Sequence, residues 1–169
     1  GKTAAFALPS LHHFATKPKA RQQYSCRMLV LSPTRELAAQ IAESFRTYGK
    51  FLGLKTDCVF GGMPIFSQKK RLAAGVDILV ATPGRLIDLI EQRAVTLKDV
   101  EIFVLDEADQ MMDLGFIHAL KRIDQLLPKQ RQTLFFSATM PKAIAELGNR
   151  FLNNPVRVSV APAATTAER

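Results

Sequence analysis

The sequence contains 169 residues, 47% of them hydrophobic and 22% charged, which fits one globular domain with a sizeable core. The longest stretch without a charged residue runs from Thr3 to Thr16, and it is too short and too polar to span a bilayer, so we expect no membrane partner. The net charge of +8 favours a polyanion such as nucleic acid as a partner.

In chain order, short aliphatic segments alternate with segments of helical periodicity. Strands are predicted at residues 27–32, 56–60, 77–81, 101–106, 133–139 and 156–160. Helices are predicted at residues 36–52, 63–74 and 83–92, after residue 106 through Leu127 with a break near Gly115, and at residues 141–152. Because the strands alternate with helices, the sequence predicts an α/β fold with a mostly parallel sheet and helices on both faces.

Polar motifs lie where five of the predicted strands end. They are SPTREL (32–37), GG (61–62), TPGR (82–85), DEAD (106–109) and SAT (137–139). The carboxyl ends of parallel strands meet at one edge of a sheet, where α/β proteins bind their ligands. The sequence therefore predicts one extended functional site at this edge.

The DEAD motif carries two carboxylates suited to nucleotide hydrolysis. Asp106 ends an apolar strand, where an unpartnered carboxylate is costly to bury, and a hydrated Mg²⁺ would satisfy it. Glu107 is placed to orient and deprotonate a water molecule that attacks the γ-phosphate. The alternative is that these acids merely begin a helix, whose dipole favours them. The full tetrad, in a chain that also contains GKT, favours the nucleotide site.

The first three residues, Gly1, Lys2 and Thr3, match the last three of a phosphate-binding loop. Lys2 is a cation able to reach β- and γ-phosphates, and Thr3 carries a hydroxyl able to ligate Mg²⁺. Their backbone amides would lie at the N-terminus of the following helix, which favours an anion there. Pro9 is expected to kink this helix rather than to forbid it. Alone the tripeptide is a weak signal, and coincidence is the alternative.

Two of the motifs share one design, a capping residue, a proline and an arginine at the start of a helix. In TPGR, Thr82 is a candidate N-cap, Gly84 leaves the backbone open and Arg85 adds positive charge. SPTRE repeats the design with Ser32 or Thr34 as the cap. Plain helix capping is the alternative for either motif alone. Two copies at one edge favour a track for a sugar-phosphate backbone, and without a base-stacking array its recognition should be sequence-independent.

The SAT motif offers a link between two strand ends. Ser137 and Thr139 carry hydroxyl groups that can hydrogen-bond to Asp109. Such bonds would transmit a change at the phosphate from one strand end to the other. The alternative is that these residues cap the following helix.

Cys26 and Cys58 are the two cysteines of the sequence, and their spacing matches neither a metal site nor a disulfide framework. We interpret them as ordinary thiols in a reducing cytoplasm.

In this order, GKT, PTREL, GG, TPGR, DEAD and SAT resemble the motifs of the first RecA-like domain of the DEAD-box RNA helicases. The segments DLGFIHALKRI and RQTLFFSATMP are most similar to the bacterial RhlE-type branch. The resemblance implies a RecA-like P-loop NTPase domain at residues 1–160, incomplete at its N-terminus, followed at residues 161–169 by the start of an interdomain linker.

The resemblance also implies a role for each matching residue, with ATP and Mg²⁺ as cofactors. Gly1, Lys2 and Thr3 would bind ATP, Thr3 and Asp106 would hold Mg²⁺ largely through water, and Glu107 would be the catalytic base. Asp109, Ser137 and Thr139 would couple hydrolysis to strand separation. The residues expected to contact the backbone of single-stranded RNA or of a short duplex are Pro33, Thr34, Arg35, Gly62, Thr82, Gly84 and Arg85.

The sequence departs from the family in what it does not contain. The upstream part of the phosphate loop, the adenine-reading Q motif and the second RecA-like domain with its arginine finger are missing. We therefore expect an RNA-stimulated ATP hydrolase only in a two-domain parent protein, whose second domain is a partner, and weak nucleotide binding without unwinding by these residues alone. The alternatives are a non-catalytic RNA-binding or partner-docking module, and a related helicase that acts on DNA.

Overall fold

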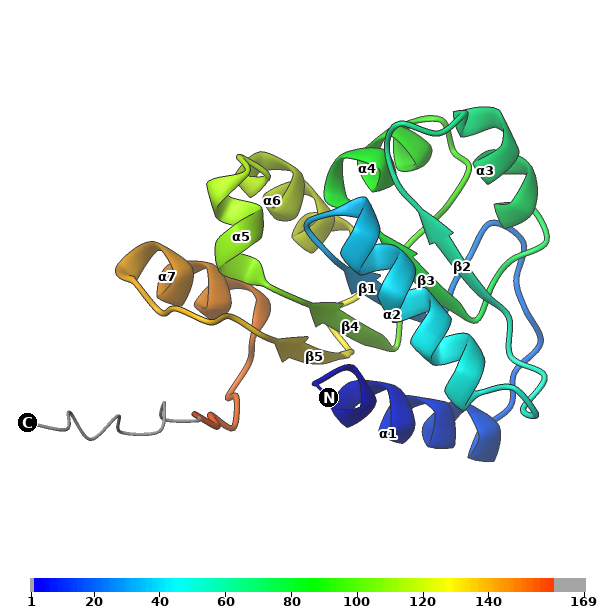
Figure 1. The fold of residues 1–169 in the computed structure, drawn as a ribbon, viewed down its shortest axis with the longest axis horizontal. Helices are drawn as coiled ribbons and strands as arrows, with labels where there is room; N and C mark the ends of the chain where they lie inside the picture. The colour runs from blue at the N-terminus through cyan, green and yellow to red at the C-terminus, as the bar shows by residue number, and fades with distance from the viewer. Residues whose placement is uncertain (1, 160–169) are drawn as a thin grey trace, which may run out of the picture.

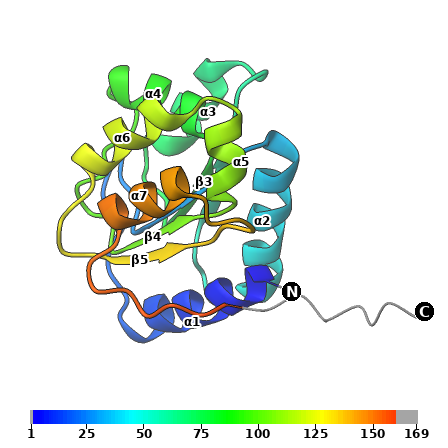
Figure 2. The same cartoon turned by 90° about the vertical axis from the view of Figure 1, so that its left-hand side faces the viewer.

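The computed structural model describes residues 2–159, and it arranges them as one parallel sheet between two layers of helices (Figures 1 and 2). The strands are β1 (Met28–Leu31), β2 (Thr56–Val59), β3 (Ile78–Ala81), β4 (Ile102–Leu105) and β5 (Gln132–Phe135). The helices are α1 (Lys2–Thr16), α2 (Arg35–Tyr48), α3 (Ile65–Leu72), α4 (Pro83–Glu91), α5 (Ala108–Asp113), α6 (Ile117–Leu126) and α7 (Lys142–Phe151).

The sheet has the strand order β2-β3-β1-β4-β5, and every pair of neighbours is parallel. Alternate residues of each central strand face opposite layers, so both sets are apolar and the strands read as aliphatic runs. One face packs against α1 and α2, and the other packs against α3 to α7 (Figure 2). The predicted α/β fold with helices on both faces is confirmed.

Burial falls from the centre of the sheet to its edges. All four residues of β1, β3 and β4 are buried, whereas β2 alternates and β5 is half-buried or exposed. Within residues 2–159, β5 pairs only with β4. Helix α1 continues through Pro9, so this proline does not forbid the helix, and the buried side chains on either side of it anchor the helix to the sheet. No helix in this part of the chain is long and apolar enough to cross a membrane.

The strand predicted at residues 156–160 is wrong for the part that the structure describes. Residues 156–159 form no strand, and the side chains of Val156 and Val158 are 91% and 88% exposed. The alternation of valine with polar residues is typical of a strand, but a strand also needs a neighbour for its backbone groups. No strand of the described sheet pairs with this segment. Val160 and the predicted linker at residues 161–169 lie outside the described residues.

Candidate nucleotide and nucleic-acid site

The motifs lie at one edge of the sheet because the strands end in register. Leu31 is level with Ala81 on one side and with Leu105 on the other. The backbone hydrogen bonds continue for one more step, from the amide of Thr82 to Val59, from Ser32 to Ala81, from Asp106 to Leu31 and from Phe136 to Leu105. The prediction that the motifs share the carboxyl edge is confirmed (Figure 1).

The GKT and DEAD motifs meet at this edge. The ammonium group of Lys2 lies 2.6 Å from Oδ1 of Asp106, whose side chain is 5% exposed. Lys2 also lies over the ring of Phe136, 5.8 Å from its centroid. Helix α1 begins at Lys2, so the half-buried Thr3 lies in its first turn. Gly1 is outside the described residues, and its predicted contact with ATP stays a prediction.

Glu107 adopts a backbone conformation that side chains generally avoid. Its φ of 57° and ψ of 55° are left-handed helical, a conformation that costs about 1–2 kcal/mol for a residue other than glycine. Its carboxylate oxygen Oε2 is buried and has no hydrogen-bond partner among the described residues. A strained backbone and an unpaired buried oxygen one residue after Asp106 are typical of a catalytic position.

The site offers few protein ligands for a metal ion. Within residues 2–159, no three His, Cys, Asp or Glu side chains cluster closely enough to hold one by themselves. Mg²⁺ prefers one or two carboxylates and takes its other oxygens from phosphate and water. The buried carboxylate of Asp106 fits this preference, and the hydroxyl of Thr3 in the first turn of α1 is a suitable donor type.

Asp109 and Thr139 are hydrogen-bonded, so the ends of β4 and β5 are linked as predicted. The hydroxyl and the backbone amide of Thr139 donate to Oδ2 of Asp109 at 2.9 and 3.1 Å. The hydroxyl of Ser137 lies 2.8 Å from the carbonyl of Thr139, to which it donates, and it also lies close enough to Asp109 to lower the pKa of that carboxyl. Partial burial raises the pKa of Asp109, but the bonds from Thr139, from the amide of Gln110 and from Ser137 outweigh it and hold the pKa below its usual value.

At the start of α2, Thr34 is the N-cap, and its hydroxyl accepts a hydrogen bond from the amide of Leu37 at 3.2 Å. The next residue, Arg35, has a side chain that is 53% exposed, with its guanidinium 5.3 Å from the centroid of the Phe60 ring. Pro33 is buried. Of this motif, Arg35 is therefore the side chain best exposed to a phosphate.

Gly61 and Gly62 form an exposed loop between β2 and α3. Gly62 has a φ of +82°, a conformation that favours glycine, and a Cβ atom there would lie 3.2 Å from Nη1 of Arg35. The loop thus lies against Arg35, and the backbone can approach a ligand closely at this point.

The TPGR motif begins α4, but its threonine does not cap the helix with its side chain. Thr82 occupies the N-cap position, as predicted, but it is 8% exposed and its side chain makes no capping bond. Pro83 at the first helical position lacks an N–H group, which leaves one fewer donor for a cap to satisfy. Gly84 is half-buried, and a Cβ there would be in ordinary contact, 3.6 Å from Phe116. The side chain of Arg85 is only 13% exposed.

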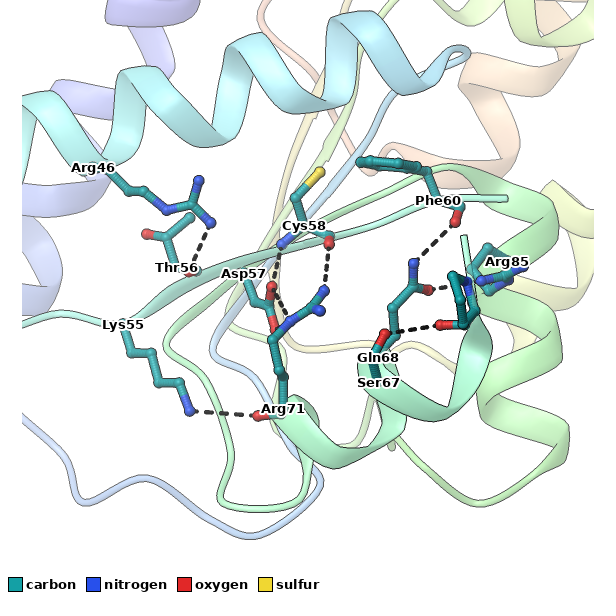
Figure 3. A network of polar contacts seen from close by, with 11 residues as sticks. Arg46, Lys55, Thr56, Asp57, Cys58, Phe60, Ser67, Gln68, Arg71 and Arg85 are labelled. Carbon is teal, nitrogen blue, oxygen red and sulfur yellow. Dashed lines mark hydrogen bonds and ion pairs between the residues drawn. The ribbon is translucent and has the colours of Figure 1, made fainter. Parts of the chain in front are cut away.

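Sequence reasoning missed one residue of this region, Gln68. It lies on α3 and is 2% exposed, and its amide bonds both to Phe60 and to Arg85 (Figure 3). The available signal is its place one turn before Leu72, on the buried side of the helix. A polar side chain at such a position needs partners.

Comparison with known proteins assigns the family. The sequence profile of the family described as DEAD/DEAH box helicase matches residues 1–147. The chain belongs to this family. Among curated proteins, this DEAD/DEAH box helicase chain is 44% identical over 168 residues to DEAD-box ATP-dependent RNA helicase CshA of Streptococcus pneumoniae, covering 99% of the chain and 31% of the relative. It is 45% identical over 161 residues to ATP-dependent RNA helicase DBP2 of Candida albicans, covering 95% of the chain and 28% of the relative.

Among solved structures, the DEAD/DEAH box helicase chain is similar to the yeast DEAD-box splicing factor Prp28. The TM-score is 0.82 at 34% identity, with 90% of this chain and 37% of Prp28 covered. This likeness confirms the RecA-like fold. The chain spans about a third of the length of these relatives. The finer similarity to the RhlE-type branch stays a prediction.

Proposed function

We propose that this chain is the ATP-binding domain of an RNA helicase that couples ATP binding and hydrolysis to local unwinding of RNA duplexes. The observation that carries the proposal is the meeting of Lys2 with Asp106 at 2.6 Å, beside the buried, unpaired oxygen of Glu107. The two curated relatives are both named ATP-dependent RNA helicases. Their names supply the substrate class that this geometry alone leaves open.

For hydrolysis, each residue of the site has a distinct task. The phosphates of ATP are bound by the ammonium group of Lys2, by the backbone amide of Gly1 and by the amides at the start of α1. Asp106 and Thr3 would hold Mg²⁺, largely through water, and this ion supplies positive charge that stabilises the transferring phosphoryl group. Glu107 accepts the proton of the attacking water through its unpaired oxygen.

For RNA, the exposed edge from α2 to α4 offers positive charge and open backbone. Arg35 provides the most exposed cation, and Gly62 and Gly84 lack side chains that would keep a sugar-phosphate backbone at a distance. Pro33, Thr34, Thr82 and Arg85 complete this track. Such contacts read the backbone and not the bases, so we expect little sequence preference and strong salt dependence.

For coupling, Asp109, Ser137 and Thr139 connect the end of β4 with the segment after β5. The bonds between Asp109 and Thr139 begin three residues after Asp106, so a change at the phosphates can alter them. The second RecA-like domain of the parent would read this change and supply an arginine finger, which is worth roughly 10³–10⁵ in rate in phosphoryl transfer. The free thiols of Cys26 and Cys58 suit a cytoplasmic location.

The test is Glu107→Gln in the parent protein that contains both domains. The variant should bind ATP with unchanged affinity but release no phosphate when single-stranded RNA is added, because the amide cannot accept the proton. The matched control is Glu43→Gln on α2, whose side chain is 73% exposed. Unchanged turnover in Glu107→Gln contradicts the assignment of the base. RNA binding that is indifferent to ATP in the unmodified parent favours the non-catalytic binding module, and equal stimulation by DNA contradicts the choice of RNA.

A further inference from the structure

Gln68 on α3 is hydrogen-bonded to two parts of the proposed RNA track, the start of the glycine loop and Arg85, and it lies in the protein interior beneath them. Its Nε2 donates a hydrogen bond to the carbonyl of Phe60 at 3.1 Å, and its Oε1 accepts one from Nη1 of Arg85 at 2.9 Å (Figure 3). The residue is 2% exposed, so both ends of a buried amide are satisfied by these two bonds. Gln68 is therefore fixed in position and cannot itself reach a ligand.

Gln68, and Arg85 to which it is bonded, hold the two ends of the exposed glycine loop. Phe60 precedes Gly61, and Met63 follows Gly62, whose φ of +82° turns the chain. Nη1 of Arg85 also donates to the carbonyl of Met63 at 2.8 Å. A Cβ placed on Gly61 would meet nothing within 4 Å, so the loop has no packing of its own at that point. The loop is positioned from its ends, through Gln68 and Arg85.

The same bonds also fix the surface beneath Arg35. The ring of Phe60 lies 5.3 Å from the Arg35 guanidinium, and the carbonyl of Phe60 is the group that Gln68 holds. Nη1 of Arg35 lies 3.2 Å from where a Cβ of Gly62 would be. Gln68 therefore connects three segments that follow different strands: the start of α2, the glycine loop and the start of α4.

We propose that Gln68 is a positioning residue of the RNA site, which holds the glycine loop and Arg85 in the arrangement that binds the sugar-phosphate backbone. The proposal rests on the proposed function, since it concerns the same RNA track. It assigns part of the RNA affinity to an uncharged side chain that touches no RNA. Removing Gln68 thus weakens RNA binding without removing a phosphate contact, and the salt dependence of binding separates these two effects.

The experiment compares Gln68→Met with Arg35→Ala in the parent protein containing both domains, with polyuridylate as the RNA. Methionine keeps the size of glutamine but loses both hydrogen bonds, and losing a bond to a charged group weakens binding about tenfold. We expect the KM for RNA in ATP hydrolysis to rise about tenfold, with kcat at saturating RNA within about twofold of the unmodified protein. The slope of log affinity against log salt should stay unchanged in Gln68→Met and fall by about one in Arg35→Ala.

Two further variants show whether the effect passes through Arg85. Gln68→Glu keeps an acceptor for Arg85, so its KM for RNA should return to within about threefold of the unmodified value. Adding Gln68→Met to Arg85→Ala should raise the KM by less than about twofold, because the bond is already lost. Gln40→Met, at an exposed position on α2, is the matched control and should change nothing.

The outcomes separate the two proposals. If polyuridylate stimulates the unmodified protein and Gln68→Met keeps its KM, the role of Gln68 is contradicted and the proposed function stands. If Gln68→Met and Gln68→Glu lower kcat and the melting temperature together and leave the KM for RNA alone, Gln68 is only a structural residue and the inference is overturned. If Gln68→Met does not unfold cooperatively, the KM of Gln68→Glu decides, and a tenfold rise there contradicts the link to Arg85. Absence of RNA stimulation in the unmodified protein contradicts the proposed function, and the role of Gln68 with it.

Discussion

The ammonium group of Lys2 lies 2.6 Å from the carboxylate of Asp106. The two residues are far apart in sequence, and parallel strand order brings the first turn of α1 to the end of β4. The side chain of Lys2 is 46% exposed, whereas Asp106 follows a buried strand and its side chain is 5% exposed. A cation suited to phosphates and a carboxylate suited to a divalent ion are thus in direct contact at this edge of the sheet.

Lys2→Ala should lower the affinity for ATP by about tenfold or more, because the charged contact to the phosphates is lost. The measurement is titration calorimetry with a non-hydrolysable ATP analogue. Lys50→Ala is the control, since Lys50 lies over the ring of Phe51 at the far end of α2. Equal affinities of Lys2→Ala and Lys50→Ala would show that Lys2 does not bind the nucleotide.

Glu107→Gly should stabilise the protein while it removes hydrolysis. Glycine adopts the left-handed conformation of Glu107 without the cost of roughly 1–2 kcal/mol, and the unpaired buried oxygen disappears. Glu107→Ala is the reference, because it removes the carboxylate but keeps the strain. We expect the free energy of unfolding in urea to be about 1 kcal/mol higher for the glycine variant than for the alanine variant. The reverse order would refute strain at this position.

Thr139→Val should raise the pKa of Asp109 towards its ordinary value. Partial burial alone raises this pKa, and the variant loses the hydroxyl bond of Thr139, the largest of the hydrogen bonds that lower it. Carboxyl carbon NMR titration of Asp109 measures the shift. In the parent protein, the same variant should unwind less duplex per ATP hydrolysed. A pKa that does not move would mean that the backbone amides of Thr139 and Gln110, with the hydroxyl of Ser137, suffice to hold the pKa of Asp109 down.

Alkaline pH should destabilise the domain through its cysteines. Burial, and then the nearby charge of Asp99, raise the pKa of Cys26 from 9.0 to about 12, while burial and Asp57 raise that of Cys58 to about 11. A pKa raised by folding gives stability that is complete below the unfolded value and is lost as the pH rises through the folded value. We therefore expect the free energy of unfolding to fall above pH 9, by at most about 1.4 kcal/mol per pH unit for each thiol.

The control for this prediction is Cys26→Ala, which should show a shallower fall above pH 9 than the unmodified protein. In the folded state at pH 8, iodoacetamide should modify Cys26 and Cys58 far more slowly than after unfolding. Identical alkaline slopes for the two proteins, measured by urea unfolding, would exclude Cys26 as the source.

The sequence predicted the central strands and the shared edge of the motifs well, because β1, β3 and β4 are buried on both faces and consist almost entirely of aliphatic residues. The strand at 156–160 failed because local alternation carries no information on whether a neighbouring strand exists. The role of Gln68 was not predicted because its hydrogen-bond partners, Phe60 and Arg85, lie outside α3 in other segments of the chain. Non-local hydrogen bonds of this kind become visible only after the chain has folded.

The strand order also determines what happens while the chain is being made. The central strand β1 is translated before both of its neighbours, β3 and β4, and Met28 is level with Ile78 in β3. At a translation rate of about 5–20 residues per second, several seconds pass between the synthesis of the aliphatic segment MLVL and that of β3, so the segment has no partner strand during this time. During this interval it is a natural target for chaperones, and overexpression that outpaces them should yield inclusion bodies.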